Sequence, residues 1–138
     1  MLDSAGLEVL ATRECLRLLA SVPLGRVVFT DQALPSVLPV IFVVHDETIV
    51  LRTSDGSKLS AAARNSVVAF EADEFDVATW TGWSVTVLGH ARLIRDNAAL
   101  AELSALDLPP WTPGRERFVV ISIEIVTGRR APPRDVVT

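Results

Sequence analysis

Two cations and two hydroxyls stand close together in residues 52–58, where they could bind a phosphate group. Arg52 and Thr53 end an apolar, β-rich run, and Ser57 and Lys58 follow after a glycine-containing turn. The alanine-rich residues after Lys58 predict a helix, whose first backbone N–H groups have no intrahelical partner. Cations, hydroxyls and free N–H groups are what a dianion needs. The segment suggests a phosphate-bearing ligand, although an ordinary strand, turn and helix capped by Ser57 has the same pattern.

Two further places could contact a planar ligand. Pro39 interrupts the apolar run from Leu38 to Val40, and proline cannot donate a backbone hydrogen bond, so it favours a strand edge or a bulge. A ligand lying along such an edge could use the neighbouring backbone groups. Trp83 and Ser84 offer a stacking surface beside a hydroxyl. An edge strand protected against aggregation and a tryptophan in the core are the alternative interpretations.

The remaining polar residues do not indicate a catalytic group or a metal site. We expect His45 in a hairpin turn and His90 in a strand, and neither has a serine or cysteine partner at a suitable spacing. Cys15 falls on the apolar face of a predicted helix. The acidic run in residues 71–76 lacks the glycine and the spacing of a calcium loop and predicts a solvated polar loop.

The composition predicts one domain spanning residues 1–138, because 49% of the residues are hydrophobic and this length supports a single core. A lone cysteine cannot form an internal disulfide, so we expect a cytoplasmic protein. Charges interrupt every apolar run before it could span a membrane. The net charge of −4 argues against general nucleic-acid binding but leaves room for a local basic pocket.

The elements that position these residues are predicted to be short. Helix starts are expected at Thr12, as a cap, at Ser57 and after Asp96, and Asn65 is expected to end the second helix in a left-handed conformation. The predicted helices span residues 12–21, 57–65 and 97–106, and the predicted strands span residues 25–30, 37–44, 48–53, 67–72, 82–94 and 118–126. Helices do not alternate regularly with strands, which argues against a parallel sheet and favours a small antiparallel barrel.

Taken in order, these segments resemble the pyridoxamine 5′-phosphate oxidase-like family of flavin-binding split barrels. The resemblance extends from about residue 14 to residue 130 and rests on the segments 23–27 (PLGRV), 37–40 (VLPV), 52–58 (RTSDGSK), 82–91 (GWSVTVLGHA) and 127–129 (TGR). It implies a mainly β fold, a six-stranded antiparallel split β-barrel with short helices. It also implies a homodimer that holds FMN in a groove between two barrels.

The resemblance assigns roles to individual residues. It places the flavin phosphate at Arg52, Thr53, Ser57 and Lys58, the isoalloxazine ring along Leu38, Pro39 and Val40, and a contribution from the opposite side at Trp83 and Ser84. Trp111 and Arg129 are further positions that it suggests. The chain lacks, after Arg129, the arginine and histidine pattern that holds pyridoxamine phosphate, so we do not expect oxidation of that substrate.

The expected function is that of an FMN flavoprotein, an oxidoreductase passing hydride or electrons between a reduced nicotinamide and a small acceptor. The flavin would supply the redox chemistry, which explains the lack of a catalytic side chain in the sequence. Two alternatives stay open. One is a deazaflavin-dependent reductase, whose longer acidic cofactor tail would need further cations such as Arg64 and Arg26. The other is a non-catalytic flavin- or haem-binding protein for storage or sensing.

Overall fold

The computed structural model describes residues 1–110 and 116–133. Within them the helices are α1 (Thr12–Leu19), α2 (Lys58–Ala62) and α3 (Asn97–Ser104), and the strands are β1 (Glu8–Val9), β2 (Leu24–Asp31), β3 (Leu34–His45), β4 (Thr48–Ser54), β5 (Arg64–Asp76), β6 (Thr81–Leu93), β7 (Glu116–Ser122) and β8 (Ile125–Ala131). None of these helices is long and apolar enough to cross a bilayer.

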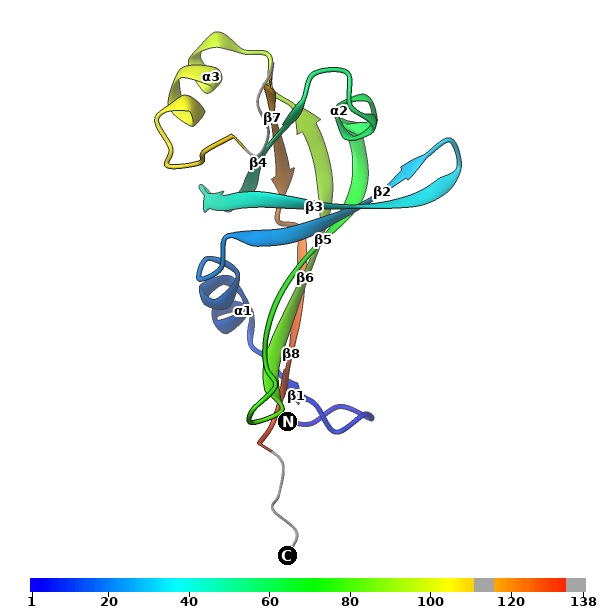
Figure 1. The fold of residues 1–138 in the computed structure, drawn as a ribbon, viewed down its shortest axis with the longest axis vertical. Coiled ribbons are helices and arrows are strands. Elements are labelled where there is room, and N and C mark those ends of the chain that lie inside the picture. Colours follow the sequence, from blue (N-terminus) through cyan, green and yellow to red (C-terminus); the bar gives the residue numbers. More distant parts are fainter. Residues whose placement is uncertain (111–115, 134–138) are drawn as a thin grey trace, which may run out of the picture.

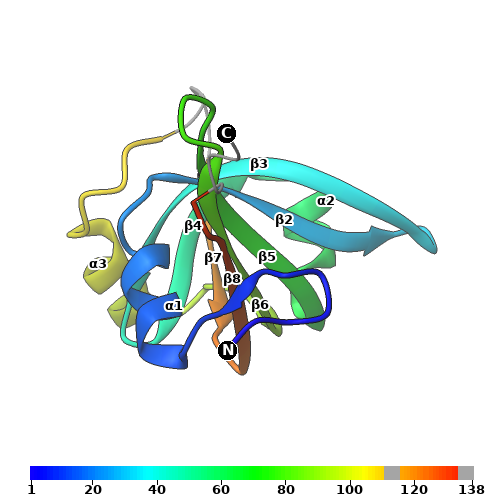
Figure 2. The ribbon, with the colours of Figure 1, turned by 90° about the horizontal axis from the view of Figure 1, so that it is seen from below.

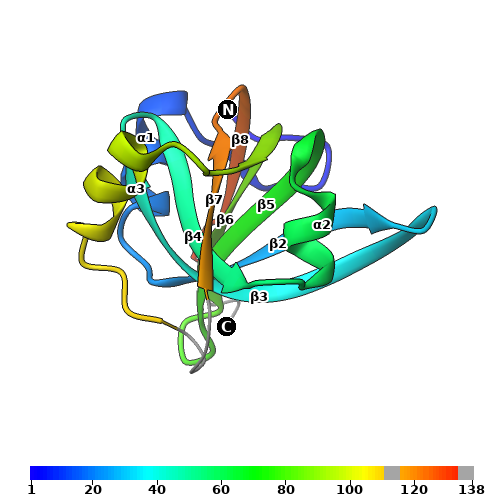
Figure 3. The same ribbon diagram turned by 90° about the horizontal axis from the view of Figure 1, so that it is seen from above.

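Six strands close into an antiparallel barrel in the order β5-β2-β3-β4-β7-β6, and the pairing of β6 with β7 completes the ring (Figure 1). The predicted split barrel with three short helices is therefore confirmed. Strands β8 and β1 extend the sheet beyond the barrel along the first half of β6. Helices α1 and α3 lie on one side of the barrel and α2 on the other, as the views from below and above show (Figure 2, Figure 3).

The long strand β6 changes partner along its length. It pairs with β5 throughout, while its other edge pairs with β8 over residues 82–88 and with β7 over residues 91–93. Gly89 lies at the change of partner, where a Cβ atom would come within 1.6 Å of the backbone oxygen of Ser122. Only glycine allows the chain ending β7 to pass so close to β6 at this point.

Four local predictions were wrong. Asn65 does not end the second helix, because α2 ends at Ala62 with Ala63 as its C-cap, and Asn65 lies at a register shift in β5. The predicted strand 118–126 is divided into β7 and β8, because the N–H of Glu124 bonds to the oxygen of Leu88 and turns the chain onto the other half of β6. Residues 73–76 were expected in a polar loop but continue β5, paired with residues 81–84 of β6. The N-cap of α1 is Ala11 rather than Thr12, without a side-chain hydrogen bond. Alternating apolar and polar residues cannot show where a strand changes partner.

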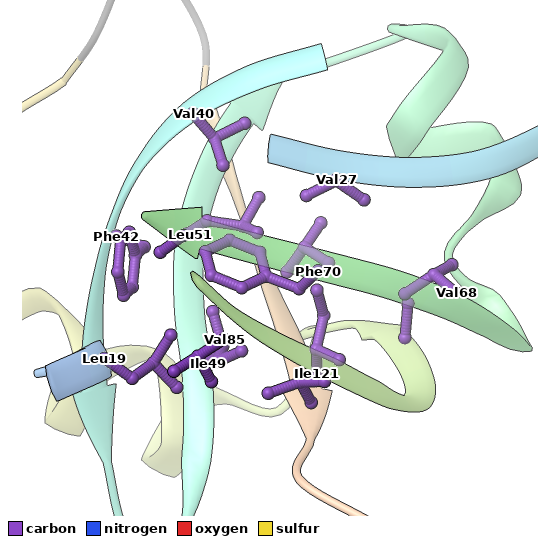
Figure 4. Close-up of a cluster of buried hydrophobic side chains, with 14 of the residues drawn as sticks. Leu19, Val27, Val40, Phe42, Ile49, Leu51, Val68, Phe70, Val85 and Ile121 are labelled. Carbon is purple, nitrogen blue, oxygen red and sulfur yellow. The ribbon is translucent and has the colours of Figure 1, made fainter. Parts of the chain in front are cut away.

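The core consists of the inward-facing residues of the barrel strands, closed at one end by Leu19 of α1 (Figure 4). Phe42 and Phe70 meet in an edge-to-face contact with ring centroids 4.7 Å apart. A second cluster, around Val50 and Phe118, packs beneath α3. The core face of β3 includes Val40 and Phe42, which leaves the opposite face of the strand available outside the barrel.

Candidate functional site

The turn between β4 and α2 brings two hydroxyls together. Ser57 caps α2 as predicted, because its Oγ accepts a hydrogen bond from the N–H of Ser60 at 3.0 Å. The hydroxyls of Thr53 and Ser57 lie 2.9 Å apart and share a hydrogen bond. Gly56 has a φ of +80°, which a glycine adopts without strain, so the chain reverses sharply before the helix. The result is a pair of oriented hydroxyls at the end of β4.

These hydroxyls border a pocket of about 250 Å³, named here the β3–β4 pocket. Six of the predicted site residues line it, together with Ser54 and Glu116: Leu38, Pro39, Val40, Arg52, Thr53 and Ser57. The wall formed by β3 is a strand edge, since residues 34–41 pair with β2 alone and only residues 42–45 pair with β4. Pro39 therefore lies in an edge stretch of β3, as its lack of a backbone donor suggested.

Arg52 lies in this pocket and contacts a carboxylate, a backbone oxygen and an aromatic ring. Its Nε is 2.8 Å from Oε2 of Glu116, its Nη1 donates to the backbone oxygen of Leu108 at 2.9 Å, and its guanidinium stands 5.1 Å from the centre of the Phe118 ring. The Nε–Oε2 contact lacks hydrogen-bond geometry. The side chain of Glu116 is only 5% exposed, so the ion pair is largely removed from water. Among the described residues, Nη2 of Arg52 has no polar partner.

Glu116 is a pocket residue that sequence reasoning missed. It is the first residue of β7, before the predicted start of this strand at residue 118, and it lies opposite Ser54 in the β4–β7 ladder. Nothing local in the sequence distinguishes this glutamate from a surface residue, because its partner Arg52 is distant along the chain. Its carboxylate compensates much of the positive charge of Arg52. The pocket consequently holds an ion pair rather than an isolated cation.

Lys58 stands outside the lining of the β3–β4 pocket. Its side chain is 74% exposed, and its Nζ lies 3.7 Å from a carboxylate oxygen of Asp31 in β2. A surface ion pair at this distance is weak, because water screens both charges. The ammonium group at the start of α2 is thus free to move toward an anion at the turn.

Trp83 and Ser84 lie apart from the β3–β4 pocket. They stand near the start of β6, where Trp83 pairs with Glu74 and Arg130, and they line a separate pocket of about 330 Å³ that also contains Arg129. In Figure 1 this end of β6 is at the base of the molecule, away from α2. Trp111 lies outside the described residues. One copy of the chain therefore presents the predicted site in two separate parts.

Both histidines are paired with carboxylates. Nε2 of His45 lies 3.0 Å from Glu102 of α3, a hydrogen bond that raises the pKa of His45, and Asp46 adds to the effect. Nδ1 of His90 lies 2.9 Å from Glu124, which lowers the pKa of that carboxyl group. Neither histidine lines the β3–β4 pocket. The geometry thus assigns them contacts between elements.

One carboxyl group on the outer face of the barrel has an unusual pKa. Burial and the neighbouring Asp73 raise the pKa of Glu71 to about 7, against the opposing effect of Arg26. Arg26 Nη1 lies 3.2 Å from Glu71 and 3.4 Å from Asp73. Arg26 is the cross-strand partner of Pro39, so this acidic pair stands two strands away from the wall of the β3–β4 pocket.

The barrel topology and the pocket at the β4–α2 turn define a class of small split-barrel proteins. A family model for pyridoxamine 5′-phosphate oxidase matches residues 11–130, so the chain belongs to that family. The uncharacterized protein Rv0080 of Mycobacterium tuberculosis is 46% identical over 123 residues, which cover 85% of this chain and 80% of that protein.

Solved structures of related proteins have the same fold as this chain. The FAD-binding protein of Mycobacterium smegmatis is 43% identical, with a TM-score of 0.79 over 91% of this chain and 100% of that one. A conserved protein of unknown function from Corynebacterium diphtheriae is 32% identical, with a TM-score of 0.76 over 89% of this chain and 96% of the other. The resemblance noted in the sequence to this family is confirmed.

Proposed function

We propose that the protein binds a flavin nucleotide in the β3–β4 pocket and uses it as a redox cofactor. The observation that carries this proposal is the hydroxyl pair of Thr53 and Ser57 beside the free edge of β3. The hydroxyls, the mobile ammonium of Lys58 and the open Nη2 of Arg52 would bind the phosphate. The backbone around Pro39 would contact the ring along the strand edge.

The pocket of one copy is too small to enclose this ligand. Its volume of about 250 Å³ is below the roughly 300–1,000 Å³ of typical ligand pockets. We propose that a homodimer completes the site, with Trp83 and Ser84 of a second copy closing the open side. Two described parts of the predicted site would then meet across the interface, although they are separate within one chain.

An exposed apolar row on the outer sheet face supports the dimer. Consecutive cross-strand partners place Val37, Val28, Ala69, Leu88 and Ile125 on one face of five strands. Val37 is 62% exposed and Ile125 is 58% exposed. Burying such a row is favourable, at about 25 cal/mol for each Å² removed from water. Sedimentation equilibrium at micromolar concentration should give twice the chain mass, and a monomer that still binds flavin would contradict this site.

The proposed reaction is transfer of hydride or electrons between a reduced nicotinamide and a small acceptor. A bound flavin supplies the electron-accepting ring, and the side chains of the pocket bind and orient it. No described residue in the pocket is needed as a proton donor in this scheme. The buried position of Cys15 agrees with our proposal of a reducing, cytoplasmic location.

FAD is a second candidate cofactor, because a protein with 43% identity and full-length coverage is named as FAD-binding. Mass spectrometry of the ligand released from natively purified protein tests the proposal and separates FMN from FAD. Visible absorbance separates both from a deazaflavin or haem. Loss of the flavin absorbance on adding a reduced nicotinamide would support the redox role. Purified protein that neither carries nor binds any flavin would overturn the proposed function.

A further inference from the structure

Three arginines close to α2 have no ion-pair partner among the described residues. They are Arg64 at the start of β5, Arg92 near the end of β6, and Arg95 just beyond β6. All three are exposed. Most other described arginines contact carboxylates: Arg17, Arg26, Arg52, Arg117, Arg129 and Arg130. In a chain with a net charge of −4, three uncompensated cations at one place call for an explanation.

The sheet itself forces two of these cations together. Arg64 and Arg92 are direct cross-strand partners in the β5–β6 ladder. Like charges opposite one another in a sheet are destabilising. The register shift at Asn65, which has a φ of +61°, fixes this pairing at the end of the ladder. A bound anion between the strands and α2 would convert this repulsion into attraction.

A pocket of about 380 Å³ lies between two of these arginines, Arg64 and Arg95, and the β4–α2 turn, and is named here the arginine pocket. Arg64 and Arg95 line it with the backbone of Gly56, while Ala61, Ala63 and Leu93 contribute apolar surface. Asp55 also lines it, but its carboxylate lies 3.2 Å from Arg117 and is compensated there. The pocket therefore combines uncompensated positive charge with an apolar surface suited to an aromatic base.

The arginine pocket and the β3–β4 pocket share one turn. Ser54 and Ser57 face the β3–β4 pocket, whereas Asp55 and Gly56 face the arginine pocket. A flavin phosphate held by Ser57 would thus be bound by the residue that directly follows Gly56 of the arginine pocket. FAD differs from FMN by an adenosine monophosphate attached to that same phosphate. In FAD, the second phosphate and the adenosine would therefore extend from the β4–α2 turn.

We propose that the arginine pocket binds the adenosine monophosphate half of FAD, which makes the dinucleotide the preferred flavin. This inference rests on the proposed function. Arg64 and Arg95 donate to the second phosphate, because the guanidinium fork matches phosphate oxygens. Arg92 strengthens the positive potential from the neighbouring strand position. The adenine packs against the apolar side formed by Ala61 and Leu93.

Binding of FMN and FAD to the purified protein, followed by quenching of flavin fluorescence, tests this inference. Wild type should bind FAD about tenfold or more tightly than FMN, since each charge-assisted hydrogen bond changes affinity by roughly that factor. Arg64→Gln and Arg95→Gln should each weaken FAD by about tenfold and leave FMN within about twofold. Arg13→Gln is the matched control, because Arg13 is also exposed and unpaired but lies on α1.

The outcomes separate this inference from the proposed function. Equal affinity of wild type for FMN and FAD, or an equal loss of both ligands in Arg64→Gln, would overturn the arginine pocket and leave flavin binding standing. If neither FMN nor FAD binds, both the arginine pocket and the proposed function would be overturned. A loss of FAD affinity in Arg13→Gln equal to that in Arg64→Gln would show a general charge effect and contradict the pocket. Circular dichroism of each variant confirms that the barrel is folded.

Discussion

Replacing Arg52 by methionine should destabilise the fold by leaving a buried carboxylate without its partner. Glu116 is 5% exposed, and Oε2 of Glu116 lies 2.8 Å from Nε of Arg52. Removing one member of a buried ion pair costs roughly 3–5 kcal/mol, because the remaining charge stays desolvated. Arg52 itself is 27% exposed, so water reaches its side of the contact. We therefore expect Arg52→Met to lower the free energy of unfolding by about 3 kcal/mol at neutral pH.

Urea denaturation followed by tryptophan fluorescence measures this free energy, and two further variants sharpen the result. Arg52→Met/Glu116→Gln should be more stable than Arg52→Met alone, since the second change removes the uncompensated charge. Lys58→Met is the matched control. Lys58 is 74% exposed and lies 3.7 Å from Asp31, so its replacement should change the stability by no more than about 0.5 kcal/mol.

Two results would refute this reasoning. The first is an Arg52→Met variant no less stable than Lys58→Met, which would mean that Glu116 does not depend on Arg52. The second is a double variant no more stable than Arg52→Met, which would assign the loss to the contacts of Arg52 with Leu108 and Phe118 instead. In either case Arg52 would not stabilise the fold as the counterion of Glu116.

Three further outcomes are expected. Lys58→Ala should weaken FMN binding by about tenfold in a fluorescence titration, while riboflavin, which lacks the phosphate, is unaffected; an equal loss for both ligands would remove Lys58 from the phosphate site. Glu102 raises the pKa of His45 in the folded protein. The contact between the two residues therefore stabilises the fold fully below the pKa of His45 in the unfolded chain, and this stabilisation is lost as the pH rises through the pKa of His45 in the folded protein. The stability difference between wild type and His45→Ala, from urea denaturation, should therefore shrink as the pH rises above about 6.5, the ordinary pKa of histidine, and a constant difference would contradict the contact. Gly89→Ala should destabilise by about 3 kcal/mol or more in thermal unfolding, because its Cβ would lie 1.6 Å from the oxygen of Ser122; an unchanged melting temperature would refute this close approach.

Local signals in the sequence predicted most elements that frame the candidate site. Ser57 caps α2, and Asp96 caps α3 by accepting from the N–H of Ala99. Asn65 does adopt the left-handed conformation, with a φ of +61°, but it does so in β5 rather than at the end of α2. Each of these features depends on a residue and its near neighbours along the chain. The edge position of Pro39 was predictable for the same reason, since a missing backbone donor restricts where a strand can pair.

Contacts between distant strands were not predictable from a single sequence. The division of the last strand depends on Leu88 accepting from Glu124, and the start of β7 places Glu116 beside Arg52. The composition allowed a local basic pocket but could not show that Arg64 and Arg92 stand opposite one another. Strand register sets these neighbours, and register is fixed by how the whole barrel closes.

The sequence by itself determined most of the elements, because caps, turn residues and alternating apolar positions act over a few residues. Its resemblance to a known family indicated the split barrel and the family. Only the tertiary structure decided which charges meet. It joined Arg52 to a buried carboxylate, left Lys58 exposed, and separated Trp83 from the β3–β4 pocket. The physical reason is that the energy of a charge depends on its burial and its partners, which the closed barrel sets through residues far apart along the chain.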